Sequence, residues 1–236
     1  MNEQTEQQET PQPLYVSLIL DESGSMQSCK RAAIAGFNQY VKSLQGEPAP
    51  TWFTLTLFNA RRTEVRHRGV PVGTVPELDV ETYRPQDTTP LYDAIGHTLA
   101  AARQEAPNGT KKLCVILTDG LENSSKEFTR KQIYALIKGC EQEGWRFVYL
   151  GADHDVWAAG EDLGVAQECR VAFSKDHLAE AFTDVSSMNA RYRRGMEGVA
   201  EASDAASGKS GEAAARIAFR RAIRPLWRAV FAGFGQ

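Results

Sequence analysis

The sequence of 236 residues lacks the long apolar runs that membrane proteins need, since no stretch reaches the roughly 18 consecutive apolar residues of a spanning helix. The first 13 residues are polar and contain no apolar core of a secretory signal, so we expect a cytoplasmic protein. The four cysteines are widely scattered and include no Cys-x-x-Cys pair. We therefore expect reduced, mostly buried thiols rather than disulfides or a zinc site.

Several signatures of catalysis and of nucleic-acid binding are also missing. No histidine stands beside a serine or cysteine in a nucleophile arrangement, and there is no glycine-rich phosphate loop of the Walker type. The formal net charge of −3 does not favour nucleic acid as a partner. A basic cluster at residues 61–68 is interrupted by Glu64 and is equally typical of an edge strand that resists aggregation.

Strand and helix patterns alternate along most of the chain. Short apolar runs predict buried strands at residues 15–20, 112–118 and 146–150. Alternation predicts a strand at 52–58 with an antiparallel partner at 64–70 across a polar turn, and a weak edge strand is predicted at 170–173. Apolar residues spaced by three and four predict a helix at 30–44, and further helices are predicted at 91–103 and 155–163. Thr129 and Gly144 are start and stop signals for another. This order predicts a doubly wound, mostly parallel, Rossmann-like α/β sheet with helices on both faces.

The composition divides the chain into four predicted regions. A flexible polar N-terminal tail covers residues 1–13, the α/β domain covers 14–175, a C-terminal helical region covers 176–207, and a basic amphipathic tail covers 208–236. Within 213–236, arginines recur every four residues beside an apolar stripe that Pro225 divides in two. This segment could fold back onto the sheet, dock a partner or lie on an anionic membrane, and the sequence leaves these three interpretations open.

Polar side chains follow two predicted strands and open one predicted helix. Asp21-Glu-Ser-Gly-Ser25 follows the first strand, Thr88-Thr89 precedes the helix at 91–103, and Asp119 follows the strand at 112–118. Because ligands bind outside the carboxyl ends of strands in such sheets, we expect these segments to converge there. Hydroxyl and carboxylate oxygens, without imidazole or thiolate, select Mg²⁺ or Mn²⁺. The predicted metal ligands are Asp21, Ser23, Ser25, Thr89 and Asp119, with Glu22, Met26, Thr88 and Glu122 as a partner-binding rim.

The Asp-x-Ser-x-Ser sequence at 21–25, the threonine at 89 and the aspartate at 119 together resemble the metal-ion-dependent adhesion site (MIDAS) of von Willebrand factor type A (vWA) domains. The resemblance covers roughly residues 14–175, and the phrases at 89–95 and 116–120 are similar to the bacterial and phage-type intracellular branch. One departure is that Asp87-Thr88 stands where the family often has Gly-Gly. Thr88 therefore competes with Thr89 as the threonine ligand, although the offset of Thr89 fits the family pattern.

This resemblance implies a non-enzymatic, metal-dependent protein-binding module. Only two formal negative charges would surround the ion, which would then favour a carboxylate offered by a partner. The family also implies an adaptor in an intracellular multiprotein system, with an ATPase, a kinase or another enzyme as partner. Two alternatives remain, namely a metal-assisted hydrolase, against which no general base is evident near the ligands, and a structural subunit that assembles through its basic tail.

Overall fold

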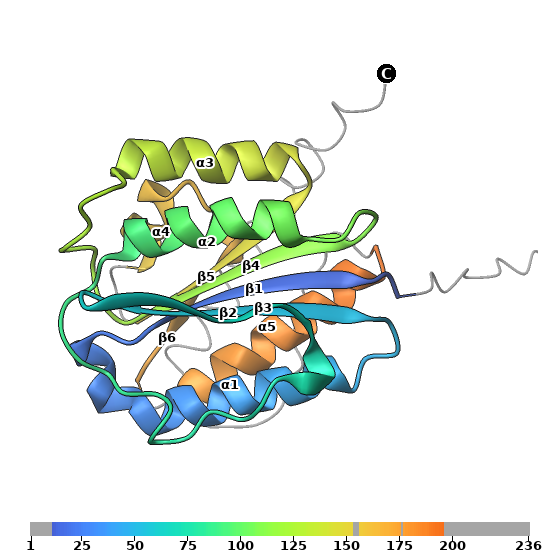
Figure 1. Cartoon of the computed structure of the whole chain (residues 1–236), viewed down its shortest axis with the longest axis horizontal. Coiled ribbons are helices and arrows are strands. Elements are labelled where there is room, and N and C mark those ends of the chain that lie inside the picture. Colours follow the sequence, from blue (N-terminus) through green and yellow to red (C-terminus); the bar gives the residue numbers. More distant parts are fainter. Residues whose placement is uncertain (1–10, 153–155, 176, 196–236) are drawn as a thin grey trace, which may run out of the picture. The chain divides into compact units, whose positions relative to one another are not determined.

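The computed structural model describes residues 11–152, 156–175 and 177–195 of the chain. Its centre is a six-stranded sheet in the order β3-β2-β1-β4-β5-β6 (Figure 1). Only β3 runs antiparallel to its neighbour among the pairs of this sheet, so the prediction of a mostly parallel α/β sheet is confirmed. The strands are β1 (Leu14–Asp21), β2 (Thr51–Asn59), β3 (Arg62–Pro71), β4 (Lys111–Thr118), β5 (Trp145–Ala152) and β6 (Arg170–Phe173).

Helices cover both faces of the sheet, as predicted. Helices α1 (Lys30–Gln45) and α5 (Leu178–Arg193) lie on one face, and α2 (Leu91–Glu105), α3 (Arg130–Gln142) and α4 (Val156–Asp162) lie on the other (Figure 1). Three short 3-10 helices are η1 (Gly24–Cys29), η2 (Val72–Thr74) and η3 (Gln167–Cys169). Within the described part of the chain, none of the helices combines the length and apolarity that a membrane crossing requires.

Strand β1 lies in the middle of the core, and all eight of its residues are buried. Its side chains alternate between two apolar clusters. Val16 and Leu18 pack toward α1 and α5, whereas Tyr15 and Ile19 pack toward α2 and α3. A parallel strand covered by helices on both faces has no solvent-facing side, which explains the continuous apolar run in its sequence.

The local signals that bracket α3 act as predicted. The backbone N–H of Thr129 donates to Gln132 Oε1 at 2.8 Å, which forms part of a capping box at the start of the helix. After the helix, Gly144 has a φ of +85°, a left-handed conformation that glycine adopts without steric cost. The chain then turns directly into β5.

Helix α5 packs along α1 and belongs to the same compact unit as the sheet. Asn189 on α5 donates to the Tyr40 hydroxyl at 2.5 Å, and the ring of Phe182 lies where a Cβ on Gly36 would be. The remainder of the predicted helical region beyond residue 195, the predicted basic tail and the first ten residues of the predicted N-terminal tail lie outside the described residues.

The cysteines are mostly buried, as the sequence predicts. All four thiols are free, and Cys29, Cys114 and Cys140 are buried, whereas Cys169 is half-buried. Burial raises the pKa of the Cys29 and Cys140 thiols to about 11. These thiols therefore remain protonated near neutral pH and contribute to the structure as small apolar side chains.

Candidate metal centre

The five predicted metal ligands come from three loops at the carboxyl edge of the sheet. Asp21 is the last residue of β1, and Asp119 directly follows β4. The parallel register pairs Leu20 with Leu117, so the ends of these two strands lie side by side. Thr89 precedes α2 and approaches from the adjoining loop.

A chain of hydrogen bonds joins four of the five predicted ligands. The Thr118 hydroxyl and the Ser23 backbone N–H donate to the two carboxylate oxygens of Asp21, at 2.5 and 2.6 Å. The Ser23 and Ser25 hydroxyl oxygens are 3.1 Å apart, and the Ser25 hydroxyl donates to Asp119 Oδ1 at 2.5 Å. Side chains that are far apart in sequence thus meet in one polar cluster.

The Thr89 hydroxyl approaches this cluster next to Gly120. A Cβ placed on Gly120 would lie 3.3 Å from both Ser25 Oγ and Thr89 Oγ1, so the two hydroxyls face one point that glycine leaves open. Thr89 is buried and its backbone N–H donates to Asn123 Oδ1 at 2.9 Å, whereas Thr88 is exposed. This geometry favours Thr89 over Thr88 as the threonine of the site.

The loop before Thr89 also shows how the chain accommodates its departure from Gly-Gly. Asp87 has a φ of +63°, in the left-handed region where glycine costs nothing and aspartate is tolerated. Its carbonyl accepts the Gly24 N–H at 2.8 Å, and its carboxylate pairs with Arg61. These contacts hold an aspartate in a backbone conformation that favours glycine.

Both carboxylates of the cluster are withdrawn from solvent. Burial raises the pKa of Asp21 to about 6; hydrogen bonds from Thr118 and Ser23 lower it in part, and the negative charge of Asp119 raises it. The Asp119 side chain is 0% exposed, and Lys175 Nζ lies 2.8 Å from its Oδ2. Positive charge near Asp21 would lower its pKa again, because it stabilises the ionised carboxylate.

The donor set fits a hard cation that uses hydroxyl as well as carboxylate oxygens. Across residues 11–152, 156–175 and 177–195, no three His, Cys, Asp or Glu side chains gather in a way that could hold a metal. The cluster instead combines two carboxylates with three hydroxyls, and the gap at Gly120 lies between two of those hydroxyls. Such a mixed oxygen set suits Mg²⁺ or Mn²⁺ better than zinc or copper.

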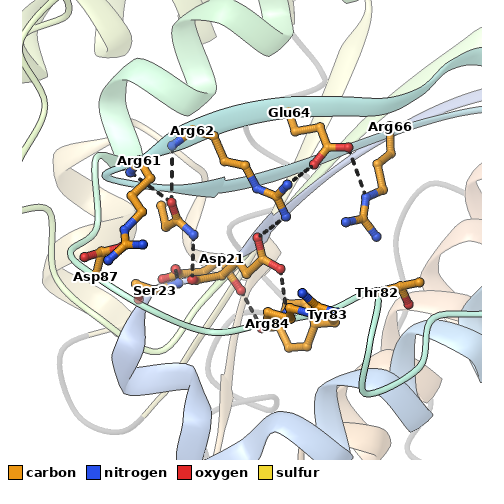
Figure 2. A network of polar contacts seen from close by, with 12 residues as sticks. Asp21, Ser23, Arg61, Arg62, Glu64, Arg66, Thr82, Tyr83, Arg84 and Asp87 are labelled. Carbon is orange, nitrogen blue, oxygen red and sulfur yellow. Dashed lines mark hydrogen bonds and ion pairs between the residues drawn. The ribbon is translucent and has the colours of Figure 1, made fainter.

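Glu22 does not form the exposed rim that the sequence predicted, because it is fully buried. Its carboxylate accepts the Arg84 backbone N–H at 2.6 Å and Arg62 Nη2 at 3.1 Å. The neighbouring Tyr83 hydroxyl donates to the carbonyl oxygen of Asp21 at 2.5 Å. Figure 2 shows this network between the β2–β3 hairpin and the end of β1. The contacts of Glu22 thus tie the loop after β1 to the hairpin and to residues 83–84.

The other predicted rim residues differ from one another. Met26 is fully buried against the α1 face of the core, so its prediction as a rim residue is also wrong. Thr88 is exposed. Glu122 is half-buried, and its carboxylate accepts the Tyr92 N–H of the first turn of α2 at 2.9 Å. An acidic side chain at a helix N-terminus is electrostatically favourable, so Glu122 has a structural use there.

Several surface residues beside the cluster were not predicted. Leu121 is 55% exposed immediately after Asp119 and Gly120, and Val80 is 53% exposed. Val80 lines an open groove of about 570 Å³ together with Lys30, Arg31 and Lys175. Leu121 follows Asp119 in the chain, whereas Lys30 and Arg31 begin α1 and Val80 lies in a loop, so only the fold brings these three residues near Lys175.

The arginines of the basic cluster at 61–68 all form ion pairs within the chain. The pairs are Arg61 with Asp87, Arg62 with Glu22 and Glu64, Arg66 with Glu64, and Arg68 with Glu105. These contacts compensate the positive charges of the hairpin.

The fold is that of a vWA domain. A vWA protein from Catenulispora acidiphila superposes with a TM-score of 0.52 at 15% identity over 76% of this chain and 43% of its own. Proximal thread matrix protein 1 of the mussel byssus superposes with a TM-score of 0.58 at 15% identity, over 77% of this chain and 47% of its own. The pilus adhesin SpaC of Lactobacillus rhamnosus GG superposes with a TM-score of 0.62 at 14% identity, over 78% of this chain and 31% of its own.

The mussel protein has also been solved with zinc in its MIDAS motif, with a TM-score of 0.55 at 16% identity over 77% of this chain and 46% of its own. This chain therefore spans less than half the length of each of these proteins. No family model and no curated protein matches the sequence. At these identities, the likeness establishes the fold alone.

Proposed function

We propose that this chain is a metal-dependent protein-binding module that holds Mg²⁺ or Mn²⁺ and uses it to bind an acidic residue of a partner. The observation that carries this proposal is the convergence of the five predicted ligands on one polar cluster at the carboxyl edge of the sheet. Ser23, Ser25 and Thr89 would supply neutral hydroxyl oxygens. Asp21 and Asp119 would supply the negative charge.

A divalent cation in this cluster would supply an electrophilic position that attracts a carboxylate. Ser25 is exposed, so the cluster is accessible from solvent. The two formal negative charges of the aspartates equal the charge of such an ion, but Lys175 compensates part of the charge of Asp119. A partner carboxylate would therefore find an attractive, incompletely neutralised site.

The surface beside the cluster suits an acidic partner as well. The groove next to it is lined by Lys30, Arg31 and Lys175, and none of its lining residues is acidic. The exposed side chains of Leu121 and Val80 add apolar contact area. Charge complementarity of this kind steers association and selects partners, while exposed apolar residues add affinity.

Calorimetric titration of the full chain with MgCl₂ tests the metal site. Asp21→Ala should abolish Mg²⁺ binding, whereas Asp184→Ala, which removes an exposed carboxylate from α5, should leave the affinity within about twofold. Circular dichroism of both variants shows whether the fold is retained. Unchanged Mg²⁺ affinity in a folded Asp21→Ala protein contradicts the proposal.

Capture of partners from the native host, with MgCl₂ or with a chelator, tests the binding role. We expect a protein that binds the wild-type chain only when Mg²⁺ is present and that fails to bind Asp21→Ala. Phosphatase and esterase assays with Mg²⁺ and Mn²⁺ test the hydrolase alternative, because turnover that is lost in Asp119→Ala would assign an enzyme. The adaptor role, an ATPase or kinase as partner, and the cytoplasmic location stay predictions.

A further inference from the structure

Lys175 contacts the candidate metal centre from outside the three loops that supply the ligands. It lies after β6, and its ammonium is 2.8 Å from Asp119 Oδ2. The other carboxylate oxygen, Oδ1, accepts the Ser25 hydroxyl. Asp119 is thus held between a predicted metal ligand and a cation of the protein itself.

The burial of Asp119 makes this ion pair stronger than a surface contact. The Asp119 side chain is 0% exposed, whereas the Lys175 side chain is 36% exposed. Shielding from water on the aspartate side weakens the solvent screening of the attraction between the two charges. The same shielding strengthens the repulsion between the ammonium and any second cation drawn to the same carboxylate.

We propose that Lys175 is an affinity-determining residue of the cation site. Its ammonium compensates Asp119 in the cation-free chain and competes with a divalent cation for that carboxylate. This inference rests on the proposed function. It adds that the charge of Lys175 lowers the affinity of the site for its cation.

A charge series at residue 175 tests this inference in the full chain. Free Mn²⁺ is counted by electron paramagnetic resonance at constant ionic strength for wild type and for Lys175→Arg, Lys175→Gln and Lys175→Glu. We expect Lys175→Arg to bind Mn²⁺ within about twofold of wild type, Lys175→Gln to bind about tenfold more tightly, and Lys175→Glu more tightly again. Lys42→Gln removes the same charge from an exposed position on α1 and should stay within about twofold.

Thermal unfolding in EDTA provides a second readout. Lys175→Gln should melt at a lower temperature than wild type, because Asp119 loses its compensating charge, and MgCl₂ should raise its melting temperature by more than it raises that of wild type. Affinity that stays flat along the series, or that falls when the charge is removed, overturns the inference. In the latter case Lys175 orients Asp119 for the ion instead of competing with it.

The outcomes also separate this inference from the proposed function. Asp21→Ala is made alone and together with Lys175→Gln, and Mn²⁺ binding is measured in both proteins. Binding that is lost in both while the charge series is flat retains the metal site and rejects the role of Lys175. Absence of Mn²⁺ uptake by wild type and by every Lys175 variant rejects the metal site itself, and the inference with it.

Discussion

The two carboxylates of the candidate metal centre are held in very different ways. The carboxylate of Asp21 accepts hydrogen bonds from uncharged donors, the Thr118 hydroxyl and the Ser23 N–H, and the Tyr83 hydroxyl and the buried Glu22 carboxylate brace the loop that follows. Asp119, after β4, instead contacts the Ser25 hydroxyl and the Lys175 ammonium. The β1 loop is therefore a preformed support, while the charge of Asp119 is compensated by a lysine, whose side chain is long and flexible.

The largest effect on stability should come from the buried support beneath the β1 loop. Glu22→Ala removes a buried carboxylate that binds a backbone N–H and Arg62, and we expect a loss of about 3 kcal/mol in the free energy of unfolding. Glu64→Ala is the matched control, because Glu64 pairs with the same arginine but is 37% exposed, and its loss should stay below about 1 kcal/mol. Urea unfolding in EDTA measures both. Equal losses would show that Glu22 gives the loop no special support.

Asp21→Asn should separate metal binding from stability. The folded chain raises the pKa of Asp21 from 3.8 to about 6, so between these pH values it binds more protons than the unfolded chain. Stability of the metal-free protein therefore falls as pH rises through this window, by up to about 3 kcal/mol in total. Asparagine is neutral and keeps a side-chain oxygen that can accept the Ser23 N–H.

We accordingly expect the Asp21→Asn protein in EDTA to be more stable than wild type at pH 7, to show a smaller fall between pH 4 and 6, and to lose its response to MgCl₂. The measurement is the difference between the two unfolding free energies across pH, which cancels the titration of the other groups. If the difference in unfolding free energy between the two proteins were independent of pH, burial would not destabilise the ionised form of Asp21.

Gly120→Ala should close the gap between the two facing hydroxyls. The added Cβ would lie 3.3 Å from Ser25 Oγ and Thr89 Oγ1, so Mg²⁺ affinity measured by calorimetry should fall on the order of tenfold while stability changes by less than about 1 kcal/mol. Gly139→Ala is the control, because nothing lies within 4 Å of its added Cβ in α3. That variant should keep the affinity and gain roughly 0.5–1 kcal/mol of stability. An unchanged Mg²⁺ affinity in Gly120→Ala would show that the cation does not bind next to this gap.

The smallest effect should come from the surface contact at the edge of the site. Arg61 pairs with Asp87, but the Arg61 side chain is 68% exposed, so Arg61→Ala should cost less than about 0.5 kcal/mol in urea unfolding. Its Mg²⁺ affinity should stay within about twofold of wild type. A larger loss would show that the ion pair is needed to hold Asp87 in its left-handed conformation.

Much of the fold could be predicted from the sequence because its signals are local. The continuous apolar run of β1 indicated a strand covered on both faces, and Thr129 and Gly144 marked the ends of α3 within a residue or two. The weak strand at 170–173 was predicted as an edge strand and is the edge strand β6. Each of these signals depends on periodicity or backbone preference within a short window.

The candidate site could be predicted only in part. Polar residues at the ends of strands are visible in the sequence, so Asp21, Ser23, Ser25 and Asp119 could be grouped from their positions along the chain alone. Burial of Glu22 could not be predicted, because the residue becomes enclosed only when the β2–β3 hairpin and residues 83–84 fold over it. A charged side chain next to a ligand loop is expected to be exposed unless its distant partners are known.

By itself, the sequence determined the alternation of strands and helices, the edge of the sheet at which the polar loops meet, and the oxygen chemistry of the side chains gathered there. Only the tertiary structure decided which threonine turns inward, which glutamate becomes a buried support and which lysine reaches Asp119. The reason is that strand and helix patterns arise from neighbours in the chain. The burial and charge of a single side chain depend on segments that approach it from elsewhere in the fold.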